Sequence, residues 1–149
     1  MKRKYKKVLV KLLRLNNTPA EIALGVAIGV FIAILPLYGF HTLLVLIAAL
    51  LVRPANKIAM LVGTNISLPP TVPFITWAGY EIGRAILKNN YPPLSWSDFK
   101  GITFQKIANF YPPLFLGSVI LGIICALIFY FLAYFIVDKT QKRKASKRQ

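Results

Sequence analysis

The sequence has few of the residues on which enzymes and metal sites depend. It holds one cysteine, one histidine and four carboxylates in 149 residues. The single cysteine, Cys125, excludes a disulfide framework and a metal site built on thiolates. No histidine, carboxylate or nucleophile stands at a spacing typical of a catalytic set. The sequence therefore predicts a protein that is not an enzyme and that uses no metal or cofactor.

Charged residues are scarce and segregated. They make up 15% of the chain, against 56% hydrophobic residues, yet the net charge is +15. Ordinary soluble domains are about 25% charged. Of the 19 basic residues, seven lie in residues 1–14 and six in residues 139–148. Because basic ends stay in the cytoplasm, this pattern predicts a membrane protein with both termini cytoplasmic.

The basic ends point to anionic lipid headgroups as partners. Residues 1–15 form a basic amphipathic segment, suited to a helix lying on the membrane surface; a solvated tail is the alternative. Residues 138–149 form a second basic tail. Basic tails also attract nucleic acid, but no recognition motif accompanies them and the chain between them is apolar. Nucleic acid is therefore not predicted as a partner, and self-association into a homo-oligomer stays open.

A first broken apolar tract covers residues 19–52 of a membrane domain at 16–137. Thr18 and Glu21 form a capping box with Pro19 at the first helical position, which predicts a helix start. The apolar stretch to Leu35 is about 21 Å long, short of the roughly 30 Å hydrocarbon core. Pro36 and Gly39 then break the helix. A single kinked span and a re-entrant hairpin compete, and the cations after residue 52 favour the hairpin.

A second broken tract covers residues 58–87. Helices are expected at Ile58–Leu68 and Phe74–Leu87, separated by Pro69, Pro70 and Pro73. Residues 88–112 are expected to form an interfacial loop with a short helix at Thr103–Asn109. Residues 114–137 are uninterrupted and apolar, about 36 Å long, and predict a transmembrane helix. For both termini to lie inside, one of the two broken tracts must cross the membrane completely, and we assign this crossing to the second.

Glycines and polar residues around the breaks are the candidate functional residues. Gly25, Gly29, Gly79 and Gly83 have the small-residue spacing that lets membrane helices approach closely. Broken helices expose backbone donors, and those at helix starts attract anions. Polar side chains near the breaks either satisfy the broken backbone or bind a ligand, and Glu81 either binds a ligand or pairs with Arg84, three residues along the same helix. These ligand-binding candidates are His41, Thr42, Asn65, Ser67, Thr71 and Glu81.

The ordered breaks resemble an uncharacterised prokaryotic membrane family, a domain of unknown function. The matching residues are Pro19, Ile22, Ala23, Gly25, Ala27, Gly29 and Phe31, then Pro36, Gly39 and Thr42, then Arg53 and Asn56, then Gly63, Thr64, Ile66, Ser67, Pro69, Thr71 and Pro73, and finally Tyr80 and Gly83. The chain departs from the family at Leu68, where asparagine is usual, and at His41, where glutamine is frequent. The resemblance implies a multi-pass protein of the prokaryotic cytoplasmic (inner) membrane. Relatives joined to glycosyltransferase-like domains imply lipid-linked or envelope chemistry.

The sequence thus predicts an all-α integral membrane protein. It has two broken or re-entrant helical hairpins, one C-terminal transmembrane helix and a basic N-terminal interfacial helix. By analogy with small transporters, the leading hypothesis is binding or translocation of an anionic or lipid-linked solute at the paired breaks. The alternative is a non-transporting membrane anchor or scaffold that assists envelope glycosyl or lipid enzymes.

Overall fold

The computed structural model describes residues 17–37, 39–66, 71–88, 91–93 and 104–146. Over these residues the chain is helical and contains no strand, as the sequence predicts. The basic segment at residues 1–15, with Ser67, Pro69 and Pro70 at the second break, lies outside the described residues. The elements are α2 (Pro19–Ile34), α3 (His41–Leu51), α4 (Lys57–Gly63), the 3-10 helix η1 (Thr64–Ile66), α5 (Val72–Ile86) and α6 (Phe104–Ser146).

Helix α2 begins at the predicted capping box. The backbone N–H of Glu21 donates to Thr18 Oγ1 at 3.3 Å, and the Thr18 N–H donates to Glu21 Oε2 at 3.0 Å. These two bonds satisfy backbone donors that have no partner within the helix. The 16 residues of α2 extend about 24 Å.

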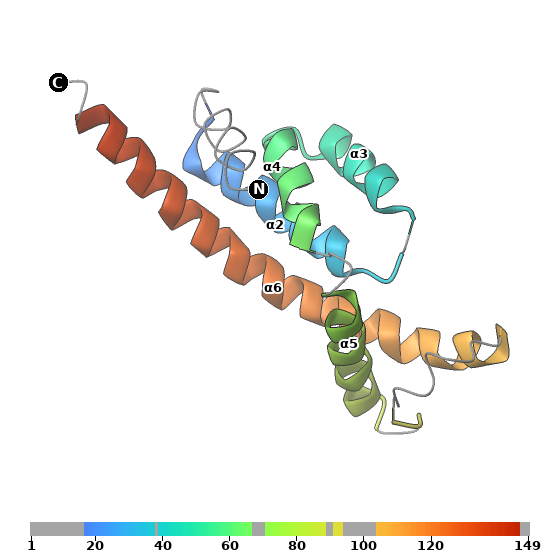
Figure 1. Ribbon diagram of the computed structural model, residues 1–149. Coiled ribbons are helices and arrows are strands. Elements are labelled where there is room, and N and C mark those ends of the chain that lie inside the picture. The colour runs from blue at the N-terminus through green and yellow to red at the C-terminus, as the bar shows by residue number, and fades with distance from the viewer. Residues whose placement is uncertain (1–16, 38, 67–70, 89–90, 94–103, 147–149) are drawn as a thin grey trace.

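Helix α3 folds back beside α2 (Figure 1). An apolar core joins α2, α3 and α4, and its buried members are Ile32, Val45, Ala49, Ala55 and Met60. After α3 the chain returns to the start of α2, where the Asn56 N–H donates to the Glu21 carbonyl at 2.9 Å. The Asn56 side chain caps α4 through the Ala59 N–H at 2.8 Å.

Helices α2 and α4 run parallel with their backbones in contact. A Cβ atom added at Gly25 would overlap the Asn56 carbonyl oxygen, and one added at Gly29 would overlap that of Met60. Gly63 of α4 lies in the same way against the carbonyl of Val26. The G-x-x-x-G stripe of α2 therefore faces α4, where larger side chains would separate the two helices.

Helix α5 crosses α6 at a second glycine contact. A Cβ atom at Gly83 would overlap the Pro113 carbonyl, and one at Gly79 would lie 2.7 Å from Ser118 Oγ. On α6, a Cβ atom at Gly117 would overlap the Gly79 carbonyl. Pro113 and Ser118 are buried in this crossing. The two helices thus meet backbone to backbone, with glycine on both sides.

The short helix predicted at Thr103–Asn109 is not separate from the helix predicted at residues 114–137. Both belong to α6, which corrects the expectation of a loop reaching residue 112. Helix α6 runs unbroken for 43 residues, about 65 Å, with Pro112 and Pro113 inside it. Proline removes a donor but keeps a helical φ angle. Because Pro113 packs on the bare backbone of Gly83, the crossing holds this turn in place. Figure 1 shows α6 bending near α5, as prolines cause.

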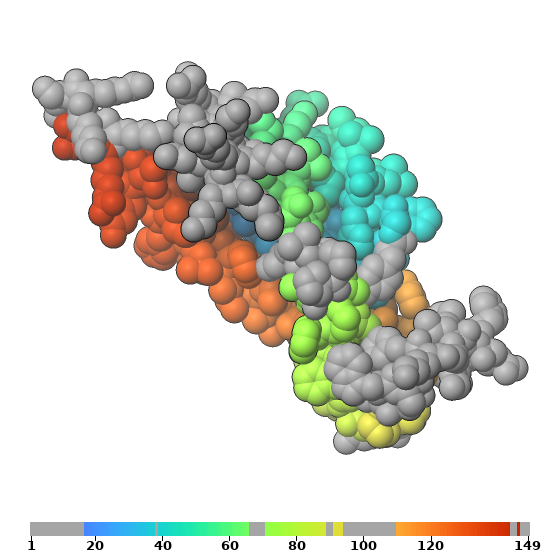
Figure 2. Space-filling view, viewed as in Figure 1, coloured from blue at the N-terminus to red at the C-terminus, as the bar shows by residue number. Residues whose placement is uncertain are grey.

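Helix α6 also packs antiparallel along α2. Near one end Gln141 Nε2 donates to the Asn17 carbonyl at 3.1 Å, and near the other Phe31 contacts Gly122. Ile22, Ala59 and Val137 form a small buried cluster where α2, α4 and α6 meet. On the face shown in Figure 2, α6 and α3 lie along opposite edges with α4 between them.

Much of the outer surface is apolar. Of the described helices, α6 alone is long and apolar enough to cross a membrane, and few of the side chains in its apolar window are buried. Large apolar side chains about half exposed line it, including Ile124, Leu127, Ile128, Phe131 and Leu132. Helix α3 exposes Leu43, Leu46, Leu50 and Leu51 in the same way. Patches this large on a soluble monomer are rare, so the surface indicates association with a membrane.

Candidate functional site

The first break is a hydrogen-bonded turn. The Leu35 carbonyl, freed by the end of α2, accepts from the Leu37 N–H at 2.8 Å and from His41 Nε2 at 3.2 Å. A carbonyl only accepts, so Nε2 of His41 carries the hydrogen. Gly39 has a φ of +89°, the left-handed conformation that favours glycine. The His41 side chain therefore joins the start of α3 to the end of α2 by a hydrogen bond across this break.

The second break begins with side chains bonded to their own helix. Thr64 Oγ1 and Asn65 Nδ2 both donate to the Leu61 carbonyl, at 2.7 and 2.9 Å. The helix expected at Ile58–Leu68 accordingly ends early, with α4 passing into η1 after Gly63. Tightening into a 3-10 turn is a common way for a helix to end. Pro73 belongs to the first turn of α5 and not to the break, because that position needs no donor.

The two breaks begin at the same end of the α2–α4 pair. Because α2 and α4 run parallel, η1 packs against α2 near the point where the first break begins. Helix α3 starts at the first break with Thr42 exposed in its first turn, and α5 starts at the second with Thr71 half-buried. This end of the α2–α4 pair therefore brings together the ends of α2 and η1 and the starts of α3 and α5.

The starts of α2, α3, α4 and α5 fall into two classes. At α2 and α4 the N-cap residues, Thr18 and Asn56, have extended backbones and bond the first turn through their side chains. At α3 and α5 the corresponding residues, Phe40 and Thr71, have helical backbones and make no side-chain cap hydrogen bond. The helix starts at the breaks therefore have no side-chain cap from their N-cap residues, and they carry the positive end of the helix dipole.

Glu81 lies away from the break. It is ten residues beyond Thr71, about 15 Å along α5. Its Oε2 accepts from Arg84 Nε at 3.1 Å and Nη2 at 2.8 Å, and the side chains of Arg84 and Glu81 are only 23% and 27% exposed. The two side chains form a partly buried ion pair one helical turn apart. Glu81 is thus occupied by a cation of its own helix.

The fold gathers basic residues that are distant in the sequence at the opposite end from the breaks. The Glu21–Asn56 and Asn17–Gln141 hydrogen bonds bring the α3–α4 turn and the end of α6 to the start of α2. Arg53, Lys57, Lys139, Lys142 and Arg143 are all exposed there. Asp138 pairs with Lys142 at 2.9 Å. The result is an exposed surface, here called the basic end, that carries an excess of positive charge.

The sequence did not predict the contacts of Tyr80 or a groove on the surface. Tyr80 is buried, donates its hydroxyl to the Pro92 carbonyl at 2.7 Å and packs edge-to-face on Phe110 at 5.3 Å, so it ties the following segment to α5. An apolar groove also lies between α2 and α6. Among the described residues no group of three histidine, cysteine or acidic side chains is placed to hold a metal ion.

One known family model matches nearly the whole chain. The family model described as an uncharacterized protein conserved in bacteria, DUF2062, matches residues 2–146. The chain belongs to the DUF2062 family. This confirms the family membership expected from the ordered breaks. No curated protein and no solved structure matches the chain. Because the DUF2062 description names no activity, function has to be argued from the geometry.

Proposed function

We propose that this DUF2062 protein is a non-enzymatic, multi-pass protein of the bacterial cytoplasmic membrane that binds and translocates an anionic lipid or lipid-linked solute. In this proposal the anionic headgroup binds at the two helix breaks. The single observation that carries it is the contrast between the helix starts. Those at the basic end are capped by side chains, and those at the breaks are not.

The proposed topology places the basic end in the cytoplasm. Helix α6 crosses the membrane, and α4 with α5 forms a second, broken crossing. This is supported by the register along α6, since α4 lies beside α2 near the basic end and Gly83 of α5 reaches Pro113. The α2–α3 pair then enters and leaves on the cytoplasmic side, because Arg53 and Lys57 return to the start of α2.

The electrostatics of the described residues favour an anion at the breaks. Of the four carboxylates in the chain, three are described. Glu21 caps α2, Glu81 pairs with Arg84, and Asp138 pairs with Lys142. Meanwhile α3 and α5 direct their positive dipole ends toward the breaks. A negatively charged group at a helix N-terminus is stabilised by about 0.3–1 kcal/mol, and more where the site is partly buried.

The surroundings of the breaks favour a lipid over a free anion. Phe40 and Leu43 beside the first break are 60% and 51% exposed, and Phe74 in the first turn of α5 is 66% exposed. A small, fully hydrated anion gains nothing from such neighbours. A phosphate that carries hydrocarbon chains matches both the donors and the apolar rim.

Charge substitutions at the helix starts test the proposal. Phe40→Asp and Thr71→Asp place a carboxylate in the first turns of α3 and α5, where it suits the helix dipole but repels an anion. Thr18→Asp is the matched control, since it puts the same charge at the start of α2 and keeps a good cap. Retention of phosphatidylglycerol is measured by native mass spectrometry of protein purified from bacterial membranes.

We expect the two break variants to bind phosphatidylglycerol at least about tenfold more weakly than wild type, a loss of about 1.4 kcal/mol, and the Thr18 control to bind normally. Translocation is then measured with a fluorescent phosphatidylglycerol in reconstituted vesicles. Wild-type binding by Phe40→Asp and Thr71→Asp would show that the breaks do not hold the headgroup.

The second candidate function is a non-transporting scaffold, which one observation favours. The side chains of His41, Thr64 and Asn65 form hydrogen bonds with backbone carbonyls of this chain. In addition, an apolar core fills the space between α2, α3 and α4. A scaffold needs only such packed breaks and an exposed partner surface. Lipid binding at the breaks without any translocation in vesicles would favour this role.

A further inference from the structure

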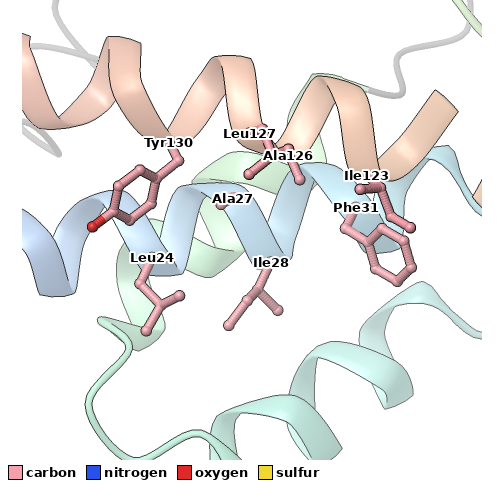
Figure 3. Close-up of a pocket in the computed structure, with 8 residues that line it drawn as sticks. All are labelled: Leu24, Ala27, Ile28, Phe31, Ile123, Ala126, Leu127 and Tyr130. Carbon is pink, nitrogen blue, oxygen red and sulfur yellow. The ribbon is translucent and has the colours of Figure 1, made fainter. Parts of the chain in front are cut away.

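A groove between α2 and α6 is lined only by apolar surface (Figure 3). Its volume is about 310 Å³ and it opens to the outside of the molecule. Two of its lining side chains, Ala27 and Ala126, are small, and the other lining side chains are large. The lining residues are Leu24, Ala27, Ile28 and Phe31 of α2 and Ile123, Ala126, Leu127 and Tyr130 of α6.

The groove is elongated along the helices. Figure 3 shows Phe31 and Ile123 at one end and Leu24 and Tyr130 at the other. Seven residues of α2 separate those ends, about 10 Å. On α6 the groove covers Ile123–Tyr130, the middle of the 114–137 apolar segment, so in the proposed topology it opens into hydrocarbon and not into water.

We infer that this groove holds one hydrocarbon chain of a membrane lipid, the lipid whose anionic headgroup the breaks bind. The inference rests on the proposed function and extends it to the tail of the ligand. The groove lining presents no polar surface, so a hydrocarbon chain can lie along it without desolvating any polar atom. A helix from a second copy is the competing occupant, and the labelling experiment below distinguishes the two.

The position of the groove relative to the breaks gives the lipid an orientation. Phe31 is three residues before the end of α2 at Ile34, about 4.5 Å along the helix, and the first break follows. A headgroup at the first break therefore places the first carbons of its chain beside the Phe31 end. The chain then runs toward Tyr130 and the basic end. With the basic end in the cytoplasm, this is the orientation of a lipid of the outer leaflet.

The test separates tail from headgroup. Ala126→Phe fills the groove, and Ile124→Phe adds the same side chain to the exposed face of α6, where the native isoleucine is 48% exposed. Binding of long-chain phosphatidylglycerol and of chain-free glycerophosphate is measured for both variants in detergent. We expect Ala126→Phe to weaken the long-chain lipid by about tenfold, as for the loss of about two buried methylene groups, and to leave glycerophosphate unchanged.

Wild-type affinity of Ala126→Phe for the long-chain lipid would overturn the groove assignment while leaving the headgroup site intact. Loss of glycerophosphate binding in Phe40→Asp would instead mark a headgroup effect. A second measurement needs no variant: a photoreactive diazirine on the lipid chain should label Ile28 or Ala126 of wild-type protein. Labelling confined to Ile124 and Ile128 would place the chain on the outer face and refute the inference.

Discussion

The backbone N–H of Asn56 donates to the carbonyl oxygen of Glu21 at 2.9 Å, joining two residues 35 positions apart. Glu21 at the same time completes the capping box of α2, and the Asn56 side chain caps α4. One small cluster therefore starts two helices and closes the loop that contains α3. Because α2 and α4 begin together, their glycines meet in register.

Asn56→Ala should destabilise the protein by about 2 kcal/mol, the upper part of the range for a lost N-cap, because Asn56 is only 7% exposed. The Ala59 N–H would lose its partner in a place that water reaches poorly. Thermal unfolding in detergent measures the effect. Asn56→Ser keeps an acceptor and should recover most of the stability. Equal losses for alanine and serine would mean that packing, and not the cap, makes Asn56 important.

Gly29→Leu should destabilise the contact between α2 and α4 by about 3 kcal/mol, as overpacking does. A side chain there overlaps the Met60 carbonyl and lies against Gly63, and neither is the flexible end of a side chain. Ala20→Leu is the control, because Ala20 is an exposed position on the same helix. If both variants unfold at the same temperature as the wild type, the α2–α4 contact does not determine the stability of the fold.

His41→Ala should cost about 1 kcal/mol, and His41→Gln should cost less. The Leu35 carbonyl keeps its bond from the Leu37 N–H, so alanine removes only one of its two donors. Glutamine supplies an N–H donor on a flexible side chain of similar reach. Unfolding temperatures of the three proteins provide the comparison. Lipid retention should be unchanged in His41→Gln, and a specific loss of lipid there would assign His41 to the ligand.

The topology can be tested at Ser146, an exposed residue in the last turn of α6. Ser146→Cys is made together with Cys125→Ala, so that a single thiol remains. A membrane-impermeant maleimide should fail to label intact cells and should label them once they are permeabilised. Efficient labelling of intact cells would place the basic end outside and reverse the proposed orientation.

Local signals predicted the helix starts better than the long-range arrangement. The Thr18 capping box placed the start of α2, and the first break separated α2 from α3 within a residue or two of the expected ends. The unbroken course of α6 through Pro112 and Pro113 was not predictable, because it depends on the approach of Gly83 from another helix. The groove had no sequence signal either, since Ala27 and Ala126 become neighbours only when α2 and α6 pair.

Proline position explains the remaining differences. A proline in a helix interior usually ends the helix, so Pro73 looked like part of the break. In the first turn it costs no hydrogen bond, and α5 accordingly starts at Val72. The contrast between capped and uncapped helix starts appears only in the structure. The sequence does not reveal that Phe40, whose side chain has no hydrogen-bonding atom, and Thr71, whose backbone is helical, stand at the N-cap positions of α3 and α5.

The antiparallel pairing of α2 and α6 has a consequence for biosynthesis. Asn17 and Gln141, joined by a hydrogen bond, are 124 positions apart in the chain. A ribosome therefore delivers α2, α3, α4 and α5 to the membrane before α6, which covers one face of α2, has been made. During that interval α2, too short to span the bilayer on its own, exposes Ala27 and Phe31 to lipid or to an insertase. Helix α6 closes this face last, so translation stalled before residue 122 should yield an intermediate held by the insertion machinery.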